Sequence, residues 1–492
     1  MKERLDALVR DLCAPDLGRA LALRLPDVIN RYRDTIQAPD EEYDPQLPLD
    51  ETDIFLIAHE HQFFGDSKKP AAHLHEFLTT QLEGVVKGVH VLSAGVSLEE
   101  MQELTRDYRV MVDVVMDQDQ DYSDPEVVIS LFEALLGYLV NGVSVVRLVT
   151  GARLVPSVRQ GSTTEGGEHL SAEIQAVLQL SREVISELAP WSVLVADAVD
   201  DGAHMVPQYA LSPLVLDAML QANAEQLRCW ARALPELPPT LTSFNVLASG
   251  GLVSRMRNSG GGISGEAHPD FLSAVTDPAL PVQQRARVFL CAQAIMLSLA
   301  GVPGVGLHNL IGSETPETEP EVHDLSGGDR AWELEFGKLV EELESPGTLR
   351  NVVFEGYKAL LRARALEPLC HPKVPQKILD LNPAVFALLR STSQNNGEGM
   401  LCIHNLSLDP VELMFSPAEF GLDIEVGMRE IIGGDIVFPS DEPGGLVSLE
   451  VDSYEVLWLR TPVHLDTDED RSFLFEDEDF PVEAAELEDK ED

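Results

Sequence analysis

Short apolar runs and longer amphipathic segments alternate along the middle of the chain. In segments 125–142, 172–189 and 282–300, apolar residues recur with the period of a helix. Apolar strands that alternate with helices predict a parallel sheet. Eight such strands predict a closed (β/α)8 barrel, a TIM barrel. The expected strands are 53–58, 88–92, 110–115, 143–149, 192–198, 205–211, 243–248 and 304–309.

The pattern changes after the barrel region. Residues 1–45 predict a helical lead-in, and the barrel is expected over 46–367. From 368 to 462, strand-length runs follow one another without helices, which predicts a C-terminal antiparallel, sandwich-like β-domain. The remaining segment, 463–492, is rich in acidic residues, a composition typical of a disordered tail.

Charge narrows the choice of partners. The chain of 492 residues has 83 acidic and 35 basic side chains, a net charge of −48. Nucleic acids and anionic membranes are bound through clustered Lys and Arg. We therefore expect neither as a partner, and interpret the acidic surface as a device for solubility or for high salt. A homo-oligomer remains open.

The cysteines and the apolar windows indicate a cytoplasmic location. Five cysteines lie far apart without a CxxC pair, which predicts reduced thiols in a reducing compartment. The first residues predict a charged amphipathic helix rather than a signal peptide. The most apolar window, 288–307, contains Gln293, Pro303 and three glycines, so it predicts a buried helix running into a strand rather than a membrane span.

A series of segments resembles glycoside hydrolase family 13, the α-amylase superfamily, and within it the sucrose phosphorylase and glucosylglycerate phosphorylase group. The resemblance runs from about Ile54 to Leu459, and GAHMVPQYALSPLVL and AIMLSLAGVPGVGLHNLIGS favour the phosphorylase group. It implies a barrel with a C-terminal β-domain. Active members of such families use two carboxylates about 5 Å apart, a nucleophile and an acid/base, with a third that holds the sugar.

All three of these carboxylates are replaced. The resemblance places the nucleophile two residues after the strand-four arginine, where Arg147 is followed by Val149. It matches the acid/base to Ala196 and the third carboxylate to Gly251. Because these side chains have no lone pair for nucleophilic or acid–base chemistry, no catalytic residue and no cofactor is assigned. We predict a pseudoenzyme that acts by binding a partner protein or a small sugar.

Polar side chains remain at the same strand ends and are candidates for ligand binding. One of them matches the family's aspartate after strand one, and two fall in an altered motif after strand three. The candidates are His61, Asp113, Gln118, Arg147 and His204.

Arg147 needs an anion in place of the missing nucleophile. Removing one partner of a buried ion pair costs about 3–5 kcal/mol, so we expect Arg147 to pair with Asp113 at the end of strand three. An Arg147 that instead faced an open polar cavity would favour an anionic ligand.

The loops that form the walls of the family's active site are shortened. SAGVSLEEMQEL joins strand two to the next helix almost directly, and residues 116–142 leave no room for the family's inserted small domain. Since barrel chemistry is carried by these loops, loss of walls and carboxylates together favours an inactive protein.

Two other functional classes stay open. An active α-glucosyl-transferring phosphorylase or glycosidase would need relocated acids from Asp197, Asp200 or Asp201, and alternation along the strand predicts that Asp197 faces the helix layer. A scaffold or regulatory subunit would bind an active homologue through its helices. Whether the protein binds a small sugar or a partner protein, its acidic surface suggests a link to osmolyte or glucoside metabolism.

Metal and phosphate motifs are weak. His59 and His61 suit zinc by spacing, but His204 and His308 are already explained by the family resemblance, so no metal site is predicted. The glycine run at 257–265 lacks the lysine and the strand–helix context of a phosphate-binding loop.

Overall fold

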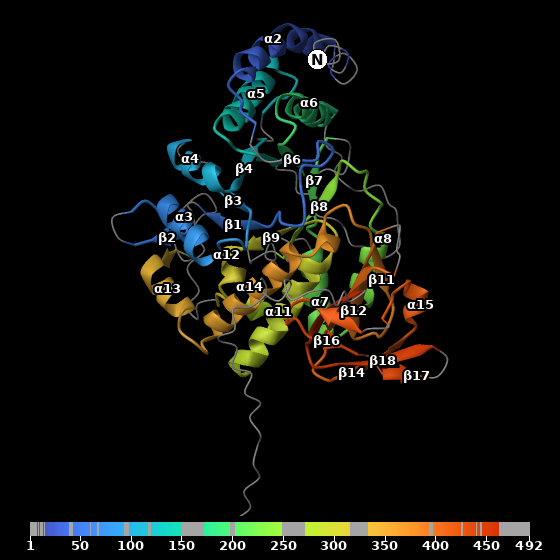
Figure 1. Ribbon diagram of the computed structural model, residues 1–492. Helices are drawn as coiled ribbons and strands as arrows, with labels where there is room; N and C mark the ends of the chain where they lie inside the picture. The colour runs from blue at the N-terminus through green and yellow to red at the C-terminus, as the bar shows by residue number, and fades with distance from the viewer. Residues whose placement is uncertain are drawn as a thin grey trace, which may run out of the picture.

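Eight parallel strands close into a barrel at the centre of the computed structural model (Figure 1). The strands hydrogen-bond in the order β1-β3-β4-β5-β6-β7-β8-β9, and β9 pairs with β1, so the predicted (β/α)8 fold is confirmed. They are β1 Phe55–His59, β3 Gly88–Leu92, β4 Arg109–Val115, β5 Val145–Val149, β6 Val193–Ala196, β7 Met205–Pro207, β8 Thr242–Val246 and β9 Val302–Gly306. The structure describes residues 7, 9, 13, 15–38, 43–59, 61–65, 68–92, 98–116, 120–149, 172–196, 202–247, 271–314, 333–392, 397–424, 427–438, 440–442 and 445–461.

Helices surround the barrel. α5 begins where Asp124 accepts a hydrogen bond from the backbone N–H of Glu126 and proline holds the first helical position, both typical start signals. α2 packs against α5 outside the barrel, where Arg24 pairs with Glu126. The helices are α2 Pro15–Arg33, α3 Pro70–Gln81, α4 Leu98–Asp107, α5 Pro125–Val140, α6 Ala172–Leu188, α7 Leu211–Gln221, α8 Glu225–Ala233, α10 Phe271–Val275, α11 Val282–Ser298, α12 Leu307–Leu310, α13 Phe336–Leu343 and α14 Leu349–Ala365.

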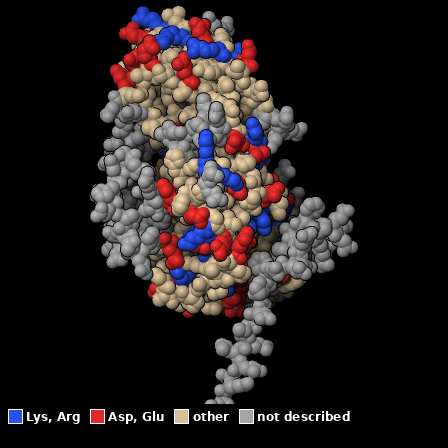
Figure 2. Space-filling model, turned by 90° about the vertical axis from the view of Figure 1, so that its left-hand side faces the viewer, with Lys and Arg blue, Asp and Glu red and all other residues tan. Residues whose placement is uncertain are grey.

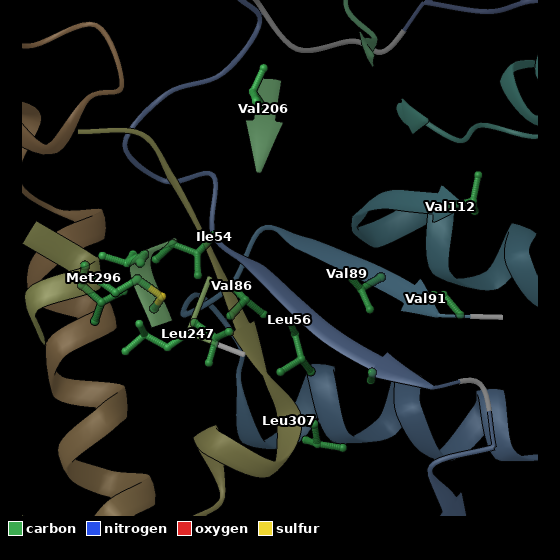
Figure 3. Packing of buried hydrophobic residues seen from close by; sticks show 14 of the residues in the cluster. Ile54, Leu56, Val86, Val89, Val91, Val112, Val206, Leu247, Met296 and Leu307 are labelled. Carbon is green, nitrogen blue, oxygen red and sulfur yellow. The ribbon is translucent and has the colours of Figure 1, made fainter. Parts of the chain in front are cut away.

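Two apolar layers stabilise the barrel. Alternate strand residues, among them Leu56, Val89 and Val112, pack against the helices in the largest core cluster (Figure 3). The other strand face fills the barrel interior with a separate cluster that includes Phe55 and Phe244. The centroids of these two rings lie 6.3 Å apart in an edge-to-face arrangement, which is typical of aromatic pairs. The side-chain alternation expected for strands therefore decides which residues face the interior.

The segment before β1 closes the floor of the barrel. Leu47 and Leu49 belong to the interior cluster. Arg109 of β4 holds this segment, since its guanidinium donates to the Pro48 carbonyl at 2.7 Å and pairs with the buried Asp53 at 2.8 Å. The N-terminal end of the barrel is thus occupied by apolar side chains, and the C-terminal end is the one available for a ligand.

The C-terminal part is antiparallel, as predicted. A six-stranded sheet, in the order β11-β12-β13-β19-β15-β16, lies beside a three-stranded sheet β14-β18-β17, and a second core cluster lies between them. The elements are β11 Gln376–Leu379, β12 Val385–Arg390, β13 Gly399–Asn405, β14 Val411–Phe415, α15 Pro417–Phe420, β15 Met428–Glu430, β16 Ile436–Val437, β17 Ser440–Glu442, β18 Leu446–Val451 and β19 Val456–Thr461.

Two buried arginines join the barrel to this part. Arg364 of α14 donates to the carbonyls of Leu297 and Gly301, and Arg390 of β12 donates to that of Ser298. Burial lowers the pKa of Arg364 to about 10. The joint therefore satisfies two guanidinium groups with backbone carbonyls, and two of these carbonyls, those of Leu297 and Ser298, come from the end of α11.

Some boundaries differ from the predicted ones. β7 ends at Pro207 and α7 begins at Leu211, and β9 passes into α12 at Leu307, because continuous apolar runs hide the change from strand to helix. A parallel pair outside the barrel, β2 Phe63–Phe64 with β10 Leu334–Glu335, was not predicted. Over the described residues, no helix is long and apolar enough to cross a membrane.

Candidate functional site

The inner faces of β4 and β5 present side chains at the C-terminal end of the barrel. Asp113 lies opposite Arg147, and Val115 lies opposite Val149, in the parallel pairing of the two strands. Paired residues on neighbouring parallel strands point to the same side. All four continue the alternation of the interior residue Met111 and therefore face the barrel axis.

Arg147 is neutralised by Asp113. Arg147 Nη1 lies 3.1 Å from Asp113 Oδ2, and the two side chains are only 17% and 18% exposed. Arg147 Nη2 donates a second hydrogen bond, of 2.7 Å, to the hydroxyl of Tyr209. The predicted pairing of Arg147 with Asp113 is confirmed, and its cause is the register that places the two residues side by side.

His90 of β3 completes this group. Its Nε2 lies 2.7 Å from Asp113 Oδ1, and the side chain is 3% exposed. Burial alone would raise the pKa of Asp113, but the hydrogen bonds from His90 and Arg147, together with the positive charge of Arg147, outweigh it and hold that pKa below its ordinary value. We call His90, Asp113, Arg147 and Tyr209 the Arg147 cluster.

An apolar edge lies beyond the Arg147 cluster. Val149 is the last residue of β5, and its neighbour Val115 is the last residue of β4. Val115 is 63% exposed, an unusual exposure for a large aliphatic side chain at the end of a barrel strand. The position that the resemblance assigns to the nucleophile is thus part of an aliphatic surface.

Ala196, which the resemblance matches to the acid/base position, lies on the outer side of β6. Ala196 pairs with Leu148, and both belong to the cluster between strands and helices, whereas Val193 and Val195 lie in the barrel interior. Ala196 therefore faces away from the barrel axis. We expected Asp197 to face the helix layer because Ala196 was taken to face the barrel axis. That reasoning no longer holds, and Asp197 itself lies outside the described residues.

His204 does not join the Arg147 cluster. It precedes β7 and is 6% exposed; its Nδ1 accepts the backbone N–H of Leu194 at 3.0 Å, and its Nε2 lies 3.5 Å from Ser186 Oγ of α6. Burial, helped by the charge of Arg182, lowers the pKa of His204 to about 4. The side chain therefore connects β6 to α6 as a neutral imidazole.

A second polar group lies where β1 and β9 end. Gln62 Nε2 donates to His308 Nε2 at 2.8 Å, and His308 Nδ1 lies 2.9 Å from Ser313 Oγ. Burial lowers the pKa of His308 to about 4. His59 ends β1, and His61 is exposed in the following turn. In the part of the chain that the structure describes, no three His, Cys, Asp or Glu side chains gather as a metal site.

Several predicted positions lie outside the described residues. These are Gln118, Gly251, Asp197, Asp200, Asp201, the glycine run 257–265 and the tail 463–492.

Sequence reasoning missed two members of the Arg147 cluster. His90 is the one polar side chain of the apolar run GVHVL, and Tyr209 follows β7 within MVPQYAL. The signal for His90 was its parity: residue 90 pairs with Met111, an interior residue. Tyr209 lies beyond the end of its strand, so alternation does not extend to it.

Comparison with known sequences identifies the relatives of this chain. A glucosylglycerate phosphorylase of Spirochaeta thermophila is 28% identical, over 93% of this chain and 98% of the relative. The chain is a relative of the glucosylglycerate phosphorylases. A second such relative, from Allomeiothermus silvanus, is 24% identical over 67% of this chain and 81% of its own length. No family model matches the chain.

Solved structures agree with the fold of these relatives. An α-amylase from H. orenii superimposes with a TM-score of 0.56 at 14% identity, covering 84% of this chain and all of that one. The sucrose 6F-phosphate phosphorylase of Thermoanaerobacter thermosaccharolyticum gives 0.50 at 13% identity, covering 73% and 95%. At such identities the likeness concerns the fold. Together with the sequence relatives, it supports the glycoside hydrolase family 13 resemblance.

Proposed function

We propose that this sugar-phosphorylase-like protein is catalytically inactive and acts by binding a small sugar or a partner protein at the C-terminal end of its barrel. The observation that carries the proposal is Val149, which occupies the inner-face position two residues after Arg147. A retaining glycosyl transfer needs a carboxylate at that place to form the covalent intermediate, and valine cannot supply one.

The surroundings of Val149 favour the same function. In the described structure, Arg147 is directed to Asp113 and Tyr209 rather than to position 149. Asp113 in turn accepts from Arg147 at one oxygen and from His90 at the other, and its pKa is lowered. A carboxylate held ionised in this way is a poor general acid at neutral pH.

The direct test is phosphorolysis. Purified protein is incubated with glucosylglycerate or sucrose plus phosphate, and with aryl α-glucosides, beside the Spirochaeta thermophila relative as a positive control. We expect no turnover above the protein-free rate. Turnover that disappears in Asp197→Asn, Asp200→Asn or Asp201→Asn would overturn the proposal.

A second candidate is an active α-glucosyl-transferring enzyme with relocated carboxylates. It is favoured by the alternation of β6: Val193 and Val195 face the interior, so the next residue of the same parity is Asp197. This candidate predicts turnover that is lost in Asp197→Asn and retained in Asp113→Asn when the latter is assayed at a temperature where it is folded.

A further inference from the structure

Helix α2 lies on α5 at the end of the molecule opposite the C-terminal sheets (Figure 1). Its inner face consists of buried residues: Leu17, Gly18, Leu21, Leu25, Val28 and Ile29. With 3.6 residues per turn, Leu23 lies opposite the middle of that face. Leu23 is 76% exposed, more than any other large apolar side chain of the described residues. The outer face of α2 therefore has an uncovered aliphatic side chain at its centre.

Charge makes this face more accessible to a second copy of the chain than most of the surface. Each chain carries a net charge of −48, so two copies repel each other in general. The sequence of α2, however, contains four arginines and two aspartates, and that of α5 contains two glutamates and no basic residue. The two helices together carry no net charge, and two copies can approach here with little repulsion.

The outer face of α2 is complementary to itself when two copies run antiparallel. Arg19 lies four residues before Leu23 and Asp27 four residues after it, so the three side chains lie on one strip of the helix. With a two-fold axis at Leu23, each Arg19 meets Asp27 of the partner subunit, and the two leucines meet at the axis. A parallel pair would instead bring like charges together.

The flanking positions fit the same arrangement. Asp16 and Asn30 lie seven residues to either side of Leu23, so they face each other across the pair without like charges. Ala20 and Pro26, three residues to either side, are small enough for the helices to approach to about 8–10 Å around the leucines.

The charged side chains of the strip are accessible. Within one chain Arg19 pairs with Asp16, and the two side chains are 77% and 95% exposed. Asp27 is exposed as well. Because water surrounds these groups, Arg19 can turn from Asp16 toward a carboxylate of a second copy without disturbing packed residues.

We infer that α2 is the contact surface of a homodimer, in which the α2 helices of two copies pack antiparallel about a two-fold axis at Leu23. The inference is independent of the proposed function, because α2 lies outside the barrel. A contact strip about 28 Å long and 10 Å wide is smaller than the roughly 800 Å² per partner of a standard interface. We therefore expect a dimer that forms reversibly as the protein concentration rises.

Sedimentation velocity of the full chain tests the inference. Over an about 100-fold range of protein concentration at about 0.15 M salt, where the screening length is about 8 Å, we expect the sedimentation coefficient to rise from the monomer toward the dimer value. A monomer at every concentration overturns the inference and leaves the outer face of α2 to a different partner protein.

Leu23→Glu tests whether α2 is the surface used. We expect it to lower the association constant at least 10-fold, because it places two carboxylates at the axis. Leu220→Glu on α7, where Leu220 is 59% exposed, adds the same charge elsewhere and is expected to change the constant less than 2-fold. A dimer that survives Leu23→Glu, or an equal loss in both variants, means that α2 is not the interface.

An exchange of charges tests the antiparallel arrangement. Arg19→Asp and Asp27→Arg each bring like charges together across the pair, so each is expected to weaken association at least 3-fold. The double variant Arg19→Asp/Asp27→Arg exchanges the two charges and should return the constant to within 2-fold of wild type. Since the double variant also lacks the ion pair with Asp16, this recovery cannot arise within one helix. Without recovery, the antiparallel arrangement is wrong.

Discussion

Arg147 carries a full charge on the inner face of the barrel, and Asp113 on the neighbouring strand β4 neutralises it. The carboxylate of Asp113 binds both Arg147 and His90. Since all three side chains are largely shielded from water, the pair interacts at a lower dielectric than a surface pair. The Arg147 cluster is therefore a structural unit as well as a candidate site.

Asp113→Asn tests the energy of this unit. It removes the negative charge and leaves Arg147 without its carboxylate, so we expect the free energy of unfolding to fall by about 3 kcal/mol. Urea denaturation measures the change. The double variant Asp113→Asn/Arg147→Met removes both charges and should recover at least half of the loss.

An exposed ion pair serves as the control. Arg24 and Glu126 are bound between α2 and α5, with side chains 42% and 70% exposed. Glu126→Gln is expected to cost less than about 1 kcal/mol, because water screens the pair. Equal losses in the two variants would show that burial does not strengthen the Arg147 pair.

At this scale the sequence predicted the ion pair but not its environment. Asp113 and Arg147 lie at equivalent points of consecutive strands, so register alone brings them together. The orientation of Ala196 was not predictable, because it depends on which residue of β5 pairs with which residue of β6. A shift of one residue in that pairing reverses every side chain of the strand.

At a few glycines in the barrel strands, the backbone lies in close contact with a neighbouring side chain. Gly88 starts β3, and a Cβ atom built there would lie 2.4 Å from the ring of Phe55. Phe55 is fully buried in the barrel interior, where it meets Phe244. This ring therefore has no solvent-exposed space into which it can move.

Gly88→Ala is expected to lower the free energy of unfolding by about 1–3 kcal/mol through overpacking. Gly137→Ala in α5 is the matched control, because no atom lies within 4 Å of the added Cβ; it should stabilise the protein by up to about 1 kcal/mol through helix propensity. Thermal unfolding of both variants measures the difference. A change of the same sign in the free energy of unfolding of both variants would contradict this explanation.

His204 makes the contact between β6 and α6 sensitive to acid. Its pKa is lowered from 6.5 to about 4 in the folded protein, so below pH 6.5 the unfolded chain takes up a proton that the folded chain does not. Stability is thus lost as the pH falls from 6.5 toward 4, and this group alone accounts for about 2 kcal/mol between pH 7 and pH 5.

His204→Gln should reduce the dependence of the unfolding free energy on pH within that window, and the part that remains comes from other buried histidines such as His308, whose pKa is also lowered to about 4. Urea denaturation at pH 7, 6 and 5 measures it, with the exposed His61→Gln as a control that keeps the wild-type slope. A wild-type slope in His204→Gln would mean that other groups cause the acid sensitivity.

Periodicity predicted every strand of the barrel but not where several of them end. Strand β3 matches its predicted bounds of 88–92, because Gly88 precedes the apolar run and the polar Ser93 follows it in the sequence. At β9 the run GVGLHN continues into α12, and nothing in its polarity marks Leu307 as helical. The pair β2 and β10 is formed by residues more than 260 positions apart, so only the folded chain specifies it.

The acidic excess belongs to the whole molecule rather than to one element. On the face shown in Figure 2, basic and acidic side chains are interspersed instead of gathering into one-sign patches. The net charge of −48 nonetheless acts on the compact state through mutual repulsion. The sequence predicts this property directly, whereas it gave no indication of the carbonyl-bound arginines, Arg364 and Arg390, at the joint.

Salt is therefore expected to stabilise the protein. Raising NaCl from 0.1 to 1 M shortens the screening length from about 10 Å to 3 Å, and we expect Tm to rise by about 5 °C or more. Scanning calorimetry measures it. Truncation after residue 462 removes 14 acidic and 2 basic residues and should reduce the salt response; a flat response in the full chain would count against adaptation to high salt.

The floor of the barrel has a consequence for the order of folding. Leu47 and Leu49 precede every barrel strand in synthesis, yet their interior cluster includes Val302 of the last one. Their apolar contacts are complete only after about 250 further residues have been made and closed into a ring, and contacts this distant in sequence slow folding. Until then these two leucines remain exposed on the nascent chain, where they are natural targets for a chaperone.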